Sequence, residues 1–115
     1  MTNYSQGHEA EKVAAEYLKN QSYKVLELNW KRPRAEIDII AQRKHGPMTF
    51  FEVKYRETES QGRGLDYITP KKLKQMSFAA ELYVAESHYT GEYCLGAIEL
   101  TGVGFDVMNC IESIS

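Results

Sequence analysis

The sequence predicts an α/β protein in which a mixed β-sheet is flanked by helices, in the order α-β-β-β-α-β-β. Two segments have the apolar periodicity of amphipathic helices, and five runs are rich in β-branched and aromatic residues. The 115 residues are 43% apolar and 26% charged, which is typical of one globular domain spanning residues 1–115. The sequence shows no apolar membrane span and no signal peptide, so we expect a cytoplasmic protein.

The first predicted helix covers approximately residues 6–20, with Ser5 as its N-cap. Glu9 borders the apolar stripe of this helix and is either a functional acid or an acid favoured by the helix dipole. A strand over residues 23–30 follows, and then a short basic loop that is either a solvated connection or a phosphate contact. The stripe consists of Ala10, Val13, Ala14, Tyr17 and Leu18, and the loop of Lys31, Arg32, Pro33 and Arg34.

A hairpin is predicted from residues 36–41 and 48–55, which are joined by a turn over residues 43–47. If the turn is symmetric about His45, residues whose numbers add up to 90 face each other. Asp38 then lies opposite Glu52, and Glu36 lies opposite Lys54. Side chains alternate along a strand, so these four share one face. The other face is expected to carry Ile37, Ile39, Phe51 and Val53.

The facing acids of this hairpin require a positive neighbour. Two carboxylates directly across a ladder repel each other and destabilise the pair. We therefore expect either the Lys54 ammonium or a metal ion between Asp38 and Glu52.

The second half of the chain is predicted to contain a loop over residues 56–68, a helix from Pro70 to about Glu86, and strands over 93–100 and 105–114. Thr69 is the expected N-cap, and Pro70 occupies the first helical position. The expected core positions of this helix are Leu73, Met76, Ala80 and Tyr83 or Val84. Its first turns carry Lys71, Lys72, Lys74 and Gln75, and cations there oppose the helix dipole unless an anion docks nearby.

Charge is distributed unevenly along the chain. Residues 1–74 hold all fourteen Lys and Arg residues and ten acids, whereas residues 75–115 hold six acids and no Lys or Arg. This asymmetry is consistent with one basic face and one acidic face. Cys94 and Cys110 are expected to be reduced thiols, and no zinc-site spacing is present.

The acids and the lysine of the hairpin favour metal chemistry on a phosphodiester. Oxygen ligands without His or Cys select Mg²⁺ or Mn²⁺, which we expect at Asp38, Glu52 and the Val53 carbonyl. Such an ion binds a phosphoryl oxygen and acidifies an attacking water. Lys54 lies two residues after Glu52 and is placed to orient that water or to neutralise developing charge.

These residues resemble a known family. Gly7-x-Glu9, the run from Glu36 to Ala41 and the run from Phe51 to Arg56 are similar to the YraN-like family of predicted endonucleases. That family is similar to archaeal Holliday junction resolvases and has the restriction-endonuclease-like fold. The resemblance covers approximately residues 4–114.

The resemblance implies that Glu9, Asp38, Glu52 and Lys54 form the acid-acid-acid-lysine set of a nuclease site. It also implies that Lys72 or Gln75 occupies the supporting helical position. The chain departs from the family in two places. Ala35 stands where the family usually has Gly, and Tyr93-Cys94-Leu95 lies where the family usually has Arg-Phe-Asp.

The sequence therefore predicts a Mg²⁺- or Mn²⁺-dependent endonuclease that acts on DNA, including branched or damaged structures. The alternatives are a non-catalytic nucleic-acid-binding or adaptor module and a purely structural ion triad in which Lys54 bridges the two acids. The expected partner is DNA, with a second copy of the chain if both strands of a junction are cut, and no membrane. The expected DNA contacts are Lys31, Arg32, Arg34, Arg56, Arg63, Lys71, Lys72 and Gln75.

Overall fold

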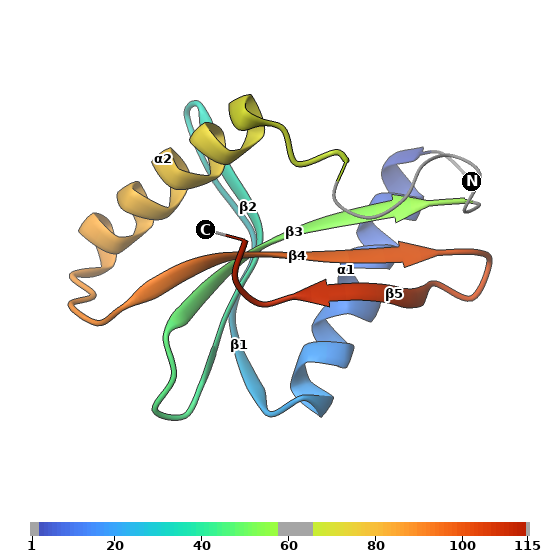
Figure 1. The fold of residues 1–115 in the computed structure, drawn as a ribbon, viewed down its shortest axis with the longest axis horizontal. Coiled ribbons are helices and arrows are strands. Elements are labelled where there is room, and N and C mark those ends of the chain that lie inside the picture. The colour runs from blue at the N-terminus through green and yellow to red at the C-terminus, as the bar shows by residue number, and fades with distance from the viewer. Residues whose placement is uncertain (1–2, 58–65, 115) are drawn as a thin grey trace.

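A computed structural model describes residues 3–57 and 66–114. The helices are α1 (Asn3–Asn20) and α2 (Pro70–Ser87). The strands are β1 (Tyr23–Arg32), β2 (Ala35–Arg43), β3 (Met48–Arg56), β4 (Tyr93–Thr101) and β5 (Asp106–Ile111). The predicted order α-β-β-β-α-β-β is confirmed (Figure 1).

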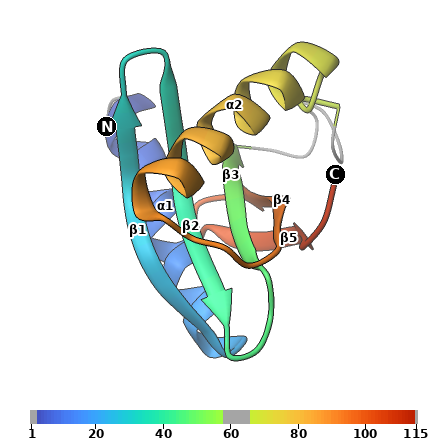
Figure 2. The same ribbon diagram turned by 90° about the vertical axis from the view of Figure 1, so that its left-hand side faces the viewer.

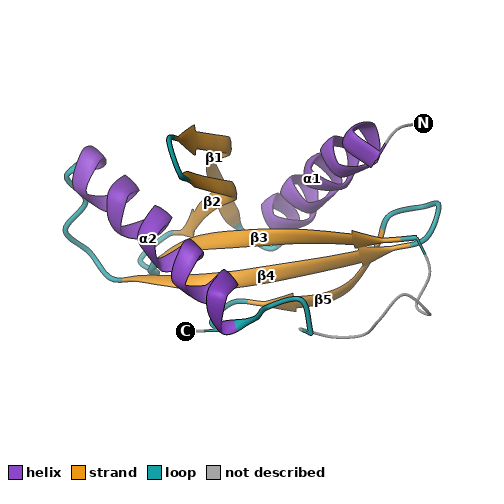
Figure 3. Cartoon of the chain, turned by 90° about the horizontal axis from the view of Figure 1, so that it is seen from above, coloured by secondary structure: helices purple, strands orange, loops and turns teal. Residues whose placement is uncertain are grey.

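The five strands form one mixed sheet in the order β1-β2-β3-β4-β5. Neighbouring strands are antiparallel except for β3 and β4, which are parallel. A parallel pair needs a crossover connection, and α2 lies within that connection. The two helices lie on opposite sides of β3 and β4 (Figure 3), and α2 crosses the sheet obliquely (Figure 2).

The hairpin register is confirmed as far as it extends. Ile39 pairs with Phe51, and the ladder continues to Gln42 and Met48, so the residue numbers of each pair add up to 90. The ladder ends at Ile39 and Phe51. The expected pairs of Asp38 with Glu52 and of Glu36 with Lys54 lie beyond this end, because β2 continues along β1 while β3 continues along β4. We call the point where β2 and β3 separate the fork.

Each face of the sheet packs against one helix. The predicted α1 stripe is confirmed, since Ala10, Ala14 and Leu18 are fully buried against Ile39 and Phe51. The other cluster joins Met76, Ala79 and Ala80 of α2 to strand residues. One prediction is wrong: Ile37 packs with Trp30 in the α2 cluster instead of sharing the α1 face with Ile39. Trp30 and Ile37 pair across β1 and β2 beyond the fork, where β1 and β2 form a separate twisted ribbon.

Several element boundaries differ from the predictions. Helix α1 begins at Asn3, before Ser5. Lys31 and Arg32 belong to β1, so the basic loop is reduced to the turn Pro33-Arg34, in which Arg34 has φ 65°. Strand β5 ends at Ile111. Most of the loop predicted over residues 56–68 lies outside the described residues.

The start of α2 is confirmed. The Thr69 side chain accepts a hydrogen bond from the Lys72 backbone N–H at 3.0 Å, and Pro70 is the first helical residue. Among the described residues, neither helix combines the length and the apolar character needed to cross a membrane.

Candidate active site

The site lies at the fork, where the separation of β2 and β3 leaves backbone groups of β3 without ladder partners from β2. Asp38 fills this gap, because its Oδ2 accepts a hydrogen bond from the Val53 N–H at 2.8 Å. In an extended strand the N–H and C=O of one residue point to the same edge. The Val53 carbonyl therefore points to the same edge of β3 as the Val53 N–H, toward Asp38.

Asp38 is held in an environment that disfavours its charge. Burial, and after it the charge of the neighbouring Glu52 carboxylate, raises the pKa of Asp38 to about 8. Glu11 and Glu36 act in the same direction, whereas the hydrogen bond from Val53 lowers the pKa. A divalent cation beside Asp38 and Glu52 would compensate this unfavourable negative charge. Carboxylates whose pKa values are shifted in this way are typical of functional sites.

The cation beside Glu52 comes from α2. The Lys72 Nζ lies 3.0 Å from the Glu52 Oε1, and both side chains are half-buried. The N-cap bond of Thr69 fixes the first turn of α2 and thereby the position of Lys72. This contact could not be predicted from the sequence, because it joins residues from separate elements.

Lys54 does not bridge the acids. Its side chain is exposed, and its Nζ lies 5.9 Å from the centre of the Tyr67 ring. Within residues 3–57 and 66–114 no ion pair joins Lys54 to Asp38 or Glu52. The structural triad centred on Lys54 is therefore wrong for this structure. Lys54 follows Glu52 on β3, so it remains close to the fork.

The acid that α1 contributes is Glu11. The charge of Glu11 raises the pKa of Asp38, and the buried Glu11 Oε1 has no hydrogen-bond partner among the described residues. Glu9, the predicted member of the set, is exposed. The signal for Glu11 was present in the sequence, because it precedes the buried Ala14 and Leu18 by three and seven residues.

Tyr67 is a second residue that sequence reasoning missed, since it lies in a segment without periodicity. The centre of its ring is also 5.5 Å from the Arg56 guanidinium carbon. Its buried hydroxyl has no hydrogen-bond partner among the described residues. Burial, with added effects of the Glu99 and Glu52 charges, raises the pKa of Tyr67 above its usual range. Tyr67 is thus a neutral phenol at the edge of the acid cluster.

Arg56 is buried, which differs from the exposed side chain expected of a DNA contact. It is 7% exposed, and its Nε lies 2.8 Å from the Oε2 of the buried Glu99. It also forms an ion pair with Asp66. This correction follows from the parallel pairing of β3 and β4, which brings Glu99 beside the end of β3. Arg63, another predicted contact, lies outside the described residues.

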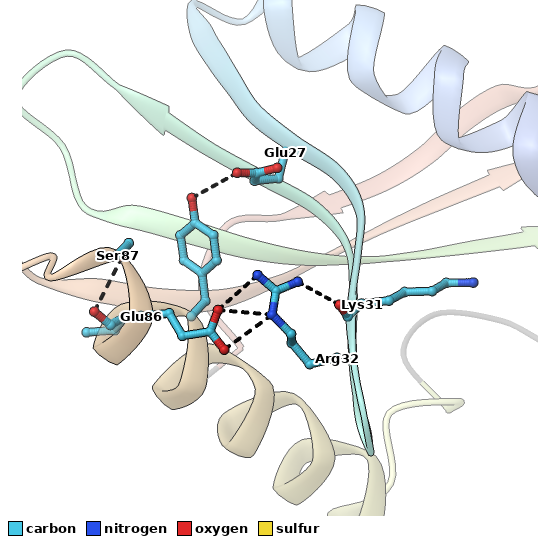
Figure 4. A network of polar contacts seen from close by, with 7 residues as sticks. Glu27, Lys31, Arg32, Glu86 and Ser87 are labelled. Carbon is cyan, nitrogen blue, oxygen red and sulfur yellow. Dashed lines mark hydrogen bonds and ion pairs between the residues drawn. The ribbon is translucent and has the colours of Figure 1, made fainter.

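Five of the six other predicted contacts line one cavity of about 350 Å³ between the β1–β2 turn and α2. Lys71 is exposed on α2 and does not line it. Arg32 is 2.9 Å from the Glu86 carboxylate (Figure 4). Its guanidinium carbon is 4.6 Å from the Trp30 ring centre. The predicted contacts that line this cavity are Lys31, Arg32, Arg34, Lys72 and Gln75.

The side chains at the fork fit a hard divalent cation. The candidate ligands are the carboxylates of Asp38 and Glu52 and the Val53 carbonyl, all of them oxygen donors. Glu11 adds a buried carboxylate oxygen that has no hydrogen-bond partner among the described residues. In the described part of the chain no three Asp, Glu, His or Cys side chains form a ready-made metal cage. This set suits Mg²⁺, which keeps several water ligands and uses one or two carboxylates.

The fold and the site define an α/β protein whose mixed sheet presents a carboxylate cluster at the fork between two strands. The model of the family described as "Uncharacterised protein family UPF0102" matches residues 10–109. The chain belongs to this family, and the YraN-like resemblance is confirmed.

Curated relatives carry the same family name. A UPF0102 protein of Cytophaga hutchinsonii is 32% identical over 102 residues, which cover 89% of each chain. One from Wolinella succinogenes is 35% identical over 98 residues, or 85% of this chain and 87% of the relative. One from Christiangramia forsetii is 40% identical over 80 residues, 70% of this chain. The matched segments cover 66% of the Christiangramia protein and 61% of a Chlorobium phaeobacteroides relative.

Proposed function

We propose that this protein is a metal-dependent endonuclease that hydrolyses phosphodiester bonds in DNA. The observation that supports this most is the state of Asp38, a carboxyl whose pKa is raised to about 8 beside a second carboxylate at the fork. A carboxyl cluster of this kind is unfavourable without added positive charge. Lys54, on the same strand as Glu52, supplies an exposed ammonium close by.

The carboxylates of Asp38 and Glu52 and the Val53 carbonyl would hold Mg²⁺ or Mn²⁺. When bound, the ion would supply Lewis acidity toward a phosphoryl oxygen and toward an attacking water. Asp38 would have to lose its proton on loading, because metal ligands bind as carboxylates. Glu11 would add negative charge from the α1 side.

Lys54 acts on the reacting phosphate in this proposal. Its Nζ lies over the Tyr67 ring at 5.9 Å and has no carboxylate partner in the described structure, so the ammonium can donate to an anionic oxygen. The lysine would orient the attacking water or stabilise the charge that develops on phosphorus-bound oxygens.

A second candidate is a DNA-binding module without turnover. The cationic cavity beside α2 favours it, because phosphate binding requires Lys and Arg but no metal ligands. The two proposals differ in one measurable respect: only the nuclease releases shortened DNA fragments.

The test is incubation with end-labelled branched, duplex and single-stranded DNA, in Mn²⁺ and in chelator. We expect fragments only with metal, and a loss of about a hundredfold or more in rate for Asp38→Asn, Glu52→Gln and Lys54→Gln. Glu81→Gln is the matched control, since Glu81 is exposed on α2 away from the fork. Binding without metal-dependent cleavage would favour the DNA-binding module, and unchanged cleavage by Asp38→Asn would reject this site.

A further inference from the structure

The cavity between the β1–β2 turn and α2 is lined by more cations than its own acids can neutralise. Lys31, Arg32, Arg34 and Lys72 line it, and Glu36 is the only acid that does so within the described residues. Its volume of about 350 Å³ lies within the range of small-ligand pockets. The excess positive charge points to an anionic ligand.

The four cations are not equally available. Arg32 is held by Glu86 and also donates to the Lys31 carbonyl at 2.8 Å (Figure 4). Its charge is therefore already engaged, although its side chain lines the cavity. The Lys31 side chain points away from this network in Figure 4. In the described part of the chain, Lys31 and Arg34 form no ion pair. These two therefore line the cavity without a described carboxylate partner.

The cavity lies next to the carboxylate site, because the two share lining residues. Glu36 and Met76 line both this cavity and a much smaller one, which Glu52 also lines. Lys72 lines the large cavity while its Nζ holds the Glu52 Oε1 at 3.0 Å. One ammonium is thus shared by the two sites. A ligand that draws Lys72 into the cavity changes the charge around Glu52.

We propose that this cavity binds a phosphate of the DNA strand next to the bond that is cut, and that this phosphate takes the Lys72 ammonium from Glu52. A flexible ammonium exchanges one anionic partner for another without other rearrangement. Release of Lys72 leaves the Glu52 carboxylate open to the metal ion, so DNA and metal strengthen each other's binding. This inference rests on the proposed function and adds how binding of DNA and binding of the metal ion are coupled at the site.

The first measurement is the salt dependence of DNA binding, made in chelator so that no cleavage intervenes. Fluorescence anisotropy with a labelled single strand should show that Lys31→Gln, Arg34→Gln and Lys72→Gln each reduce the slope of log Kd against log salt by about 0.7. Lys24→Gln, at the far end of β1, should leave the slope unchanged.

The second measurement is metal affinity without DNA, read from the electron paramagnetic resonance of free Mn²⁺. Lys72→Gln should bind Mn²⁺ about fivefold more tightly than the wild type, because a competing cation has been removed. Lys72→Arg keeps the charge and should retain wild-type affinity. Lys74→Gln removes a charge from the same helix outside the cavity and should change little.

The third measurement joins the two ligands. Ca²⁺ also takes carboxylate oxygens, and we expect it to strengthen DNA binding by the wild type more than by Lys72→Gln. Unchanged salt slopes in all three cavity variants, or an Mn²⁺ affinity of Lys72→Gln equal to that of the wild type, would overturn this inference. Failure of the wild type to bind Mn²⁺ would instead reject the proposed function, while the salt slopes would still decide whether the cavity binds phosphate.

Discussion

Asp38 combines two roles that oppose each other in the folded protein. Its Oδ2 accepts the Val53 N–H that the end of the β2–β3 ladder leaves without a partner. Its burial beside Glu52 makes the ionised form unfavourable. The hydrogen bond needs only an oxygen acceptor, whereas the unfavourable energy comes from the charge, so substitution with Asn separates the two.

Asp38→Asn is therefore expected to stabilise the metal-free protein. Folded Asp38 keeps its proton up to a pKa of about 8, whereas an unfolded Asp loses it near its ordinary value of 3.8. The free energy of unfolding consequently falls as pH rises between these values, and Asn, which does not titrate, removes this loss. We expect a gain of at least about 1 kcal/mol at neutral pH. Thermal melts in chelator from about pH 5 to about pH 9 measure it.

The gain should be largest at alkaline pH and should disappear in acid, where Asp38 is protonated in both states. Ser77→Ala, on α2, is a control in which no titrating group changes. A lower melting temperature of Asp38→Asn throughout this range would show that the Asp38 charge stabilises the fold. That result would count against a metal site at the fork.

Glu11 and Glu9 provide a matched pair of acids on α1. Because the Glu11 charge raises the pKa of Asp38 and the Glu9 side chain is exposed, Glu11→Gln should weaken Mn²⁺ binding several-fold and Glu9→Gln should not. Titration of both variants with Mn²⁺ measures this. Equal losses of Mn²⁺ affinity in the two variants would indicate that Glu9 also contributes to the site.

At the scale of elements, one buried ion pair connects β3 to β4. Arg56, at the end of β3, contacts Glu99 of β4, which also accepts a hydrogen bond from Asn109 of β5 at 2.9 Å. Three strands are thus joined by two buried charged side chains. Removal of one partner would leave the other charge buried without compensation.

Arg56→Met should accordingly lower the free energy of unfolding by about 3 kcal/mol or more. The double variant Arg56→Met with Glu99→Met should recover much of this loss, because no lone charge remains. Urea unfolding of both proteins measures it. The salt slope of DNA binding by Arg56→Met should equal that of the wild type, and a smaller slope would restore Arg56 as a DNA contact.

Local features of the fold could be predicted from the sequence, while contacts between distant elements could not. The β2–β3 register follows from a short turn centred on His45, and the start of α2 follows from Thr69 and Pro70. Both depend only on neighbouring residues. The end of the ladder at Ile39 depends on where β1 and β4 take over the pairing, which no local pattern records.

The same limit explains the mixed result for the candidate site. Asp38, Glu52 and Val53 are brought together at the fork, as expected from their hairpin. The partner of Glu52 is Lys72, which lies twenty residues later on another element. Arg56 resembles a surface cation in sequence, and only the long-range pairing with β4 reveals its buried partner. Glu11 precedes the buried Ala14 and Leu18 by three and seven residues, and this spacing favours it over the exposed Glu9.

At the scale of the whole molecule, the site draws on four elements. Glu11 comes from α1, Asp38 from β2, Glu52 from β3 and Lys72 from α2. The unfolded chain does not hold these groups together. A metal ion at the fork would therefore bind the folded protein in preference to the unfolded chain.

Mg²⁺ should thus raise the thermal stability of the wild type. At a free concentration of tenfold the Kd, we expect about 1.4 kcal/mol at one site. Asp38→Asn should show no such increase, and a sodium salt at equal ionic strength should act on both proteins alike. Differential scanning fluorimetry measures the shifts. Equal stabilisation of both proteins by Mg²⁺ would indicate binding elsewhere.

The parallel pairing of β3 with β4 also bears on how the chain reaches its native state. Every paired position in this ladder joins residues forty-five apart in the chain, from Met48 with Tyr93 to Arg56 with Thr101. The β1–β2–β3 meander needs only short turns, so it can form while the chain is still being synthesised. Loop-closure entropy makes the β4 contacts late and slow. Until β4 pairs with it, β3 has unpaired backbone groups along one edge of a strand that contains the apolar Phe50 and Phe51, and a nascent chain in this state is open to association with other chains.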